Sequence, residues 1–217
     1  MRYFSILITF VLLSCNNEKI IQLPEITEAE ITEVLDVSPA YIFYDDTQPD
    51  STSFNRKNVI STTNWLVNVD KRLSLKQALP HIQFLQNKRR KASMHKNENA
   101  KNYFTCNDTS IKNLGFLEFT NTKFFTKNNH PFSEEDNLCW ITFESLNRVT
   151  TSSSLDFNFA FDKDTFENTL TMLREECKNS SEILLVFNSQ MNFQDYISVK
   201  SQLKSFESII SNDEFFY

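Results

Sequence analysis

The residues of this chain that are best suited to chemistry are its four cysteines and three histidines. No two cysteines have the CxxC spacing, which argues against a thioredoxin-like redox site or a zinc knuckle. The histidines are His81, His95 and His130, and none has a metal-ligand partner at i+2, i+3 or i+4 that would make a recognisable site. A nucleophile pair of Cys106 with His95 or His130 has no supporting local signature. We therefore predict no catalytic residue, no metal site and no cofactor.

Glycine is nearly absent, since Gly115 is the only one in 217 residues. Phosphate-binding loops, nucleophile elbows and dinucleotide turns need glycine, because their backbone takes positive φ or approaches the ligand closely. Nucleotide-binding and α/β-hydrolase folds are therefore disfavoured. The acidic segment 45–51 lacks the alternating carboxylates and the glycine of a calcium loop, so we interpret it as a solvated turn.

The N-terminus has the pattern of an exported chain. Arg2 precedes an uncharged apolar run, residues 4–13, which has the length of a secretory h-region and is shorter than the roughly 20 residues that span a bilayer. The run ends in LLSC, residues 12–15, which resembles the lipobox of bacterial lipoproteins. The resemblance implies a signal peptide over 1–14, cleavage between Ser14 and Cys15, and a lipid on the Cys15 thiol. An uncleaved anchor with a chance cysteine is the alternative.

Three further cysteines are Cys106, Cys139 and Cys177. In an exported protein an odd number leaves one thiol unpaired within the chain. Cys139 lies in an apolar run and Cys177 at the end of an expected helix, so these two could form a disulfide. The other two pairings stay open at this point.

The chain is acidic, with a formal net charge of −6. It should therefore have no general attraction for nucleic acid. The basic cluster, residues 88–91, falls where a helix should end, and cations are favourable at that end of the helix dipole. We interpret it as a solvated helix terminus.

Composition divides the chain into four parts. The signal peptide is followed by a Glu-rich tether over 15–37, an N-terminal α/β half over 38–130, and a C-terminal α/β half over 131–217. The N-terminal half contains a long polar excursion over 86–113. Trp65 and Trp140 lie in apolar strands and should be in the core. Phe124 and Phe125 lie between lysines, and the segment 123–130 is therefore an expected exposed aromatic patch.

Periodicity predicts the order ββαβαβ in the C-terminal half. Strands are expected at 138–143, 155–161, 183–187 and 213–217, with helices that begin after Asp164 and Asn192. In the N-terminal half a strand at 60–69 leads to a helix near Leu75, where Pro80 stands either in the first turn or at a kink. Interleaved strands and amphipathic helices indicate two-layer α/β sandwiches with mixed sheets.

Two segments share one pattern. The strand, turn and helix that begin near residue 64 return 118 residues later, with the same apolar rhythm and almost no identical residues. Any buried strand that feeds an amphipathic helix has this rhythm. The pattern is consistent with a degenerate repeat of a strand-turn-helix cassette, without demanding a duplication.

The second cassette, LLVFNSQMNFQDYISV at 184–199, resembles the periplasmic domain of the ExbD/TolR family, in which a strand ending in Asp or Asn leads into a helix opened by an aromatic residue. The resemblance covers roughly 133–217. It implies a periplasmic binding or dimerising fold, and so a homodimer as one arrangement. Members of that family have a membrane helix with a carboxylate for proton-driven work, whereas residues 3–14 contain no Asp or Glu.

Taken together, the sequence predicts a lipid-anchored protein of the bacterial cell envelope with a non-catalytic binding or assembly role, accessory to an envelope transport system. Its partners would be the membrane, through the lipid, and a protein. Asn16 follows Cys15 in place of the Asp that favours inner-membrane retention, so the outer membrane, facing the periplasm, is expected. The alternative is an exported hydrolase with an unrecognised active site, which would show a pocket of convergent titratable groups.

Overall fold

The unit that recurs in this fold is a buried strand followed by a helix. β4 (Asn64–Val69) leads into α2 (Leu75–Lys91), and β11 (Glu182–Phe187) leads into α4 (Phe193–Leu203). Ser74 and Asn192 cap the two helices, because each side-chain oxygen accepts a hydrogen bond from the backbone N–H three residues later. The computed structural model describes residues 19–91, 97–126, 138–151, 156–158, 168, 171, 172, 175, 177, 178, 180, 182–203 and 210–217.

The first sheet is formed by strands from the N-terminal part of the chain. Besides β4 it contains β1 (Glu25–Ile26), β2 (Val37–Tyr44), β3 (Thr52–Asn55), β5 (Asn102–Asp108) and β6 (Asn113–Glu118). The strand order is β1-β5-β4-β2-β3, and β6 also pairs with β5. Neighbours among β1, β5, β4 and β2 are parallel, whereas β3 and β6 are antiparallel to their partners, so the sheet is mixed.

The second sheet combines β11 with β7 (Lys123–Thr126), β8 (Leu138–Ser145), β9 (Arg148–Thr151), β10 (Asp156–Asn158) and β12 (Ile210–Phe216). The order is β10-β9-β8-β11-β12-β7. Neighbours among β8, β11, β12 and β7 are parallel, and β9 is antiparallel to both β8 and β10. This sheet is therefore also mixed.

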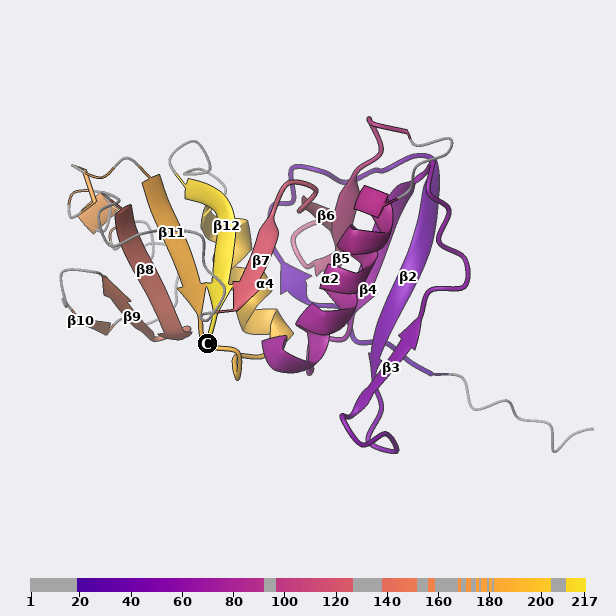
Figure 1. Cartoon of the computed structure of the whole chain (residues 1–217), viewed down its shortest axis with the longest axis horizontal. Helices are drawn as coiled ribbons and strands as arrows, with labels where there is room; N and C mark the ends of the chain where they lie inside the picture. The colour runs from indigo at the N-terminus through magenta and orange to yellow at the C-terminus, as the bar shows by residue number, and fades with distance from the viewer. Residues whose placement is uncertain are drawn as a thin grey trace, which may run out of the picture.

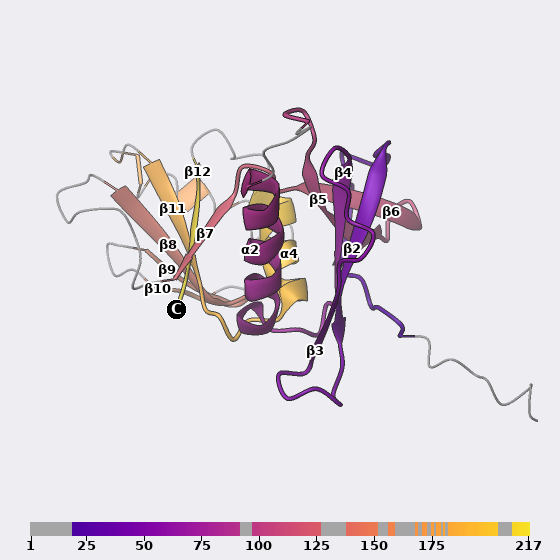
Figure 2. The ribbon, with the colours of Figure 1, turned by 45° about the vertical axis from the view of Figure 1, so that its right-hand side comes forward.

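The two helices lie between the two sheets (Figures 1 and 2). Both helices occupy one layer and contact both sheets: α2 contacts β4 and β7, and α4 contacts β1 and β12. The core is continuous across the junction: the ring of Phe104, from β5, lies 5.2 Å from that of Phe193 and 6.3 Å from that of Tyr196, both on α4. The predicted α/β class, with mixed sheets packed by amphipathic helices, is confirmed.

The two cassettes meet in a reciprocal contact. β4 and β11 begin at residues 64 and 182, and α2 and α4 at 75 and 193, so both pairs are 118 positions apart. The backbone N–H of Leu75 donates to the carbonyl of Met191 (2.8 Å), and that of Phe193 donates to Leu73 (2.7 Å). The two donors occupy equivalent positions in the two cassettes, and so do the two acceptors, as in the interface of a twofold-symmetric dimer. A second such pair links Lys76 N–H to Ser189 (2.8 Å) and Gln194 N–H to Lys71 (3.3 Å).

The strand orders match in the same way. The orders β5-β4-β2-β3 and β12-β11-β8-β9 place equivalent strands at equivalent positions. The full ββαβαβ order predicted for the C-terminal half is not confirmed, because the helix expected after Asp164 falls largely outside the described residues. The described elements there are β8, β9 and β10, then β11, α4 and β12.

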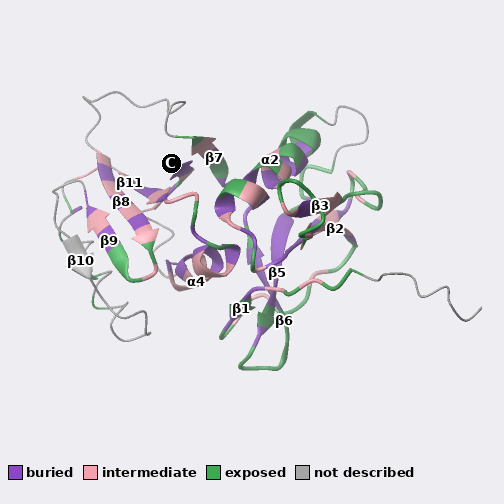
Figure 3. Ribbon diagram, turned by 90° about the horizontal axis from the view of Figure 1, so that it is seen from below, coloured by how far each residue is buried: buried purple, intermediate pink, exposed green. Residues whose placement is uncertain are grey.

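The prediction of a tether over 15–37 is wrong for the described residues 19–36, which lie on the fold. β1 pairs with β5 and packs beside α4 (Figure 3). The Glu25 backbone N–H donates to Gln194 Oε1 (2.7 Å), and Gln194 Nε2 donates back to the Glu25 carbonyl (2.9 Å). Lys19 bonds Asp45 at 2.7 Å. The acidic, Glu-rich composition suggested solvation, but these backbone and ionic contacts hold the segment.

The polar excursion over 86–113 is also corrected. Its start is the last turn and a half of α2, and its end contains β5, an inner strand of the first sheet. In addition, β7 at 123–126 belongs to the second sheet, although the sequence analysis counted it with the N-terminal half. The sheets therefore change between β6 and β7. Finally, α2 begins at Leu75, so Pro80 lies inside the helix and not in its first turn.

Candidate functional site

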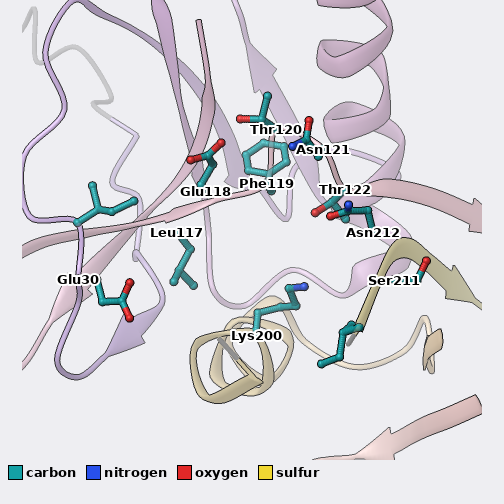
Figure 4. Close-up of a pocket in the computed structure, with 12 residues that line it drawn as sticks. Glu30, Leu117, Glu118, Phe119, Thr120, Asn121, Thr122, Lys200, Ser211 and Asn212 are labelled. Carbon is teal, nitrogen blue, oxygen red and sulfur yellow. The ribbon is translucent and has the colours of Figure 1, made fainter. Parts of the chain in front are cut away.

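The strongest candidate site is a cavity of about 420 Å³ between the two parts of the fold (Figure 4). Its walls come from residues 30–31, the end of β6 and the turn after it (117–122), Lys200 of α4, and the start of β12 (210–212). Small-molecule sites usually have volumes of roughly 300–1,000 Å³ and lie at such junctions. The cavity is therefore large enough for a small ligand.

Lys200, which lines the cavity, belongs to a buried polar cluster behind the lining. Tyr196 and Lys200 are four residues apart and so share one face of α4. Both reach Glu214 of β12: the Tyr196 hydroxyl donates to Oε2 at 2.8 Å, and Lys200 Nζ donates to Oε1 at 2.6 Å. Glu214 has no exposed surface. Each carboxylate oxygen thus has a donor, as a buried charge requires.

This environment decides the protonation of Tyr196. Burial raises the pKa of the phenol well above its ordinary value, and the negative charge of Glu214 raises it further. Tyr196 therefore stays protonated and serves as a donor to Glu214. A tyrosine in this state is not a general base.

Lys200 presents its ammonium group to the cavity (Figure 4). The group has three N–H donors, and one of them is bonded to Glu214. The side chain retains 23% of its exposure, whereas that of Glu214 retains 1%. The remaining donors of Lys200 are therefore available to a ligand from the cavity side.

Other residues of the cavity lining carry hydroxyl and amide groups. Thr120 Oγ1 accepts from the Asn102 backbone N–H at 3.0 Å, and Ser211 Oγ accepts from that of Asp213 at 3.1 Å. Each hydroxyl hydrogen can therefore still be donated. Asn121 and Asn212 add amide groups to the lining. The result is a wall rich in neutral hydrogen-bond donors.

Charged groups complete the lining. It contains two carboxylates, Glu30 and Glu118, and Glu118 bonds Lys101 at 2.7 Å. None of its residues is a cysteine or a histidine. Within the described part of the chain, no group of three or more His, Cys, Asp or Glu side chains could hold a metal ion.

A second opening, of about 480 Å³, is more apolar. It lies between α2 and the ends of β7 and β12, where Leu79, Phe125 and Tyr217 contribute. The neighbouring edge of β7 is covered by α2: Gln83 Nε2 donates to the Phe124 carbonyl (3.0 Å), and Gln86 Nε2 to that of Thr122 (2.7 Å). Such coverage protects a strand edge from further pairing.

The expected aromatic patch over 123–130 is not exposed where the structure describes it. Phe124 retains only 7% of its exposure, and its ring packs on Phe216. Phe125 stacks on Phe215 at 5.4 Å. The two rings lie on opposite faces of β7, with Phe124 buried and Phe125 half-buried, while Lys123 and Thr126 are exposed.

The four cysteines differ in their environments. Cys15, together with Ser14 at the expected cleavage site, lies outside the described residues. Cys139 and Cys177 form a disulfide, with their Cα atoms 5.5 Å apart. Cys106 is free and fully buried in β5, and burial raises the pKa of its thiol, so it is unreactive.

His81, the one histidine among the described residues, makes contacts within the fold. His81 Nε2 lies 3.1 Å from Thr52 Oγ1, which donates to Asp50 at 2.7 Å, and its ring packs on Phe54. Burial lowers the pKa of His81, and the nearby Asp50 partly opposes this. His95 and His130 lie outside the described residues.

The acidic segment 45–51 is a turn held by its own side chains. Asp45 accepts from Thr47 and Lys19, and these bonds lower its pKa to about 2. The basic cluster at 88–91 forms the last turn of α2, and all of it is exposed as predicted except Arg89, which is 93% buried and lies 4.0 Å above the Trp65 ring. Burial lowers the pKa of Arg89 to about 10. Trp65 itself is fully buried, as predicted.

Sequence reasoning missed Lys200 and the two residues that bind it into the cluster, Tyr196 and Glu214. One signal was present: Tyr196 and Lys200 stand at i and i+4 on a helix, and Glu214 is an acidic residue within an otherwise apolar strand end, Glu214–Tyr217. An acidic residue at a buried strand position needs a donor nearby.

No protein-family model matches this chain, and neither the curated proteins nor the solved structures contain a significant match. The likeness of residues 133–217 to the ExbD/TolR family therefore stays an expectation. No helix among the described residues is long and apolar enough to cross a membrane.

Proposed function

We propose that this protein is a lipid-anchored component of a bacterial cell envelope that binds a partner without transforming it, in the service of an envelope transport system. The observation that carries the binding role is the cavity at the junction of the two sheets. Its hydroxyl, amide, ammonium and carboxylate groups can each form hydrogen bonds with a ligand.

The anchoring role rests on the N-terminal sequence. An apolar h-region followed by LLSC supports lipid attachment at Cys15, and Asn16 supports the outer membrane. The folded part would lie close to the membrane, because Lys19, four residues after Cys15, already bonds Asp45 at the end of β2.

Density-gradient separation of bacterial membranes tests this proposal. The wild-type protein should sediment with the outer membrane, and the Cys15→Ala variant should leave that fraction. Cys106→Ala is the matched control, because it removes a buried thiol without touching the anchor, and it should sediment like the wild type. A Cys15→Ala variant that stays in the outer membrane would refute the proposal.

A further inference from the structure

The cavity at the junction is electrically polarised. Figure 4 shows the carboxylates of Glu30 and Glu118 on one side, and Asn212 and Ser211 on the other. Lys200 extends from α4 between these two sides. Apolar surface from Leu117 and Ile31 completes the lining. A ligand that spans the cavity therefore meets acceptors at one end and donors at the other.

The donor end suits a carboxylate. Glu214 cannot serve the ligand, because it has no exposed surface and both of its oxygens are bonded. Lys200 keeps two N–H donors, and the Ser211 hydroxyl keeps one. Charge-assisted hydrogen bonds from an ammonium to a carboxylate are about twice as strong as neutral ones.

A ligand with one charged group would use only one side of the cavity. Glu118 is paired with Lys101 through Oε2, and Lys200 is paired with Glu214. A ligand with a negative group alone would reach only the Lys200 donors, and one with a positive group alone would leave these donors unpaired.

We propose that the cavity binds a small zwitterion, an amino acid or a short peptide, with its carboxylate on Lys200 and its ammonium toward Glu118. This inference rests on the proposed binding function and names the ligand class for the same site. The apolar wall would contact the ligand side chain. The volume of about 420 Å³ is within the range of small-molecule sites.

Isothermal titration of the full-length, detergent-solubilised protein tests the inference. The probes are alanine, the dipeptide Ala-Ala, N-acetyl-Ala-Ala and the C-terminal amide of Ala-Ala. Each blocked dipeptide should bind at least about tenfold more weakly than Ala-Ala, because each loses one charged end. Tighter binding of alanine than of Ala-Ala assigns the site to amino acids, and the reverse order assigns it to peptides.

Two variants locate the ends of the ligand. Lys200→Met combined with Glu214→Gln removes both members of the buried ion pair, so that no charge is left unpaired. It should weaken Ala-Ala about tenfold and leave the amide unchanged. Glu118→Gln should weaken Ala-Ala and leave the N-acetyl form unchanged. Lys123→Met, which removes an ion pair with Asp213 outside the cavity lining, is the control and should bind like the wild type.

Equal affinity for Ala-Ala and its blocked forms would overturn the inference, and so would no binding of any probe up to about 10 mM. The comparison of probes on the wild-type protein is decisive even where a variant does not fold. A protein that binds no probe but still sediments with the outer membrane through Cys15 would refute the zwitterion and leave the anchored function intact.

Discussion

At the scale of single residues, the buried carboxylate of Asp70 lies where a cation neutralises it. Asp70 has no exposed surface, and it follows β4 at the position that Asn188 has after β11. Both side chains accept a hydrogen bond from the backbone N–H two residues later. Asp70 additionally pairs with Arg72 through two bonds of 2.8 Å. The first cassette thus uses an ion pair where the second uses an amide.

This difference predicts a pH effect. Burial would raise the pKa of Asp70, but the bonds from Arg72 and from the Gln22 backbone outweigh burial and lower it. A carboxyl whose pKa is lowered in the folded state stabilises the fold above its unfolded pKa of about 3.9, and this contribution is lost as the pH falls through the folded pKa. Asp70→Asn should therefore lower the free energy of unfolding by about 2 kcal/mol at pH 7.

Urea unfolding at pH 7 and at pH 3 measures this effect. The difference between wild type and Asp70→Asn should shrink at pH 3. Asn188→Ala is the matched control, since it loses a neutral hydrogen bond and its effect should not change with pH. An Asp70→Asn deficit that is the same at both pH values would contradict the assignment.

The cysteines predict a second effect at this scale. The Cys139–Cys177 bridge closes a loop with a sequence separation of 38 residues, and a bridge of this span stabilises by about 3–4 kcal/mol in the chain-entropy model. Cys139→Ala with Cys177→Ala should lower the unfolding free energy by that amount, as measured in urea. Peptide mapping that finds both thiols free in the wild type would remove the bridge from the account.

At the scale of elements, the reciprocal contact between the cassettes joins the two sheets. Lys76→Pro tests it, because proline is tolerated in the first turn of a helix and the Lys76 side chain is exposed. The substitution removes the N–H that donates to Ser189. It should destabilise by about 1–2 kcal/mol relative to Lys76→Ala, which keeps that N–H. Equal stability of the two variants, measured by thermal unfolding, would show that the bond contributes nothing.

The apolar pattern of the sequence was sufficient to predict a strand or helix where one face of that element is apolar throughout. The strand that leads into α4 was expected at 183–187 and lies at Glu182–Phe187, and the helix that follows Asn192 begins at Phe193. β5 escaped notice because Asn102, Thr105 and Asp108 are buried polar residues that break its hydrophobic alternation. The Asp108 carboxylate accepts from the backbone of Ala29 and Ser110, contacts that no local pattern shows.

The candidate site was beyond prediction for a related reason. Its walls belong to segments that meet only in the folded molecule, from Glu30 to Asn212. The end of β6 and the start of β12 come together because β7 crosses from the first part of the chain to the second sheet. Such long-range strand pairing is set by packing of the whole chain and leaves no periodicity in the sequence.

At the scale of the whole molecule, the shared core predicts one cooperative unfolding transition. β7 covers the edge of β12, and Phe104 of the first sheet packs against α4 of the second part. Circular dichroism and calorimetry should therefore give coincident midpoints. Two separated transitions would mean that the sheets are independent. For the same reason, a fragment that starts at residue 131 lacks β7 and should be less stable than the intact chain.

The central claim, that this fold is carried on a membrane by a lipid, is tested most directly by mass spectrometry of the mature N-terminus. The account predicts that protein extracted from membranes begins at Cys15 and that its first peptide carries a diacylglycerol-type lipid on the thiol. A chain that begins at Met1 with an unmodified Cys15 would contradict it.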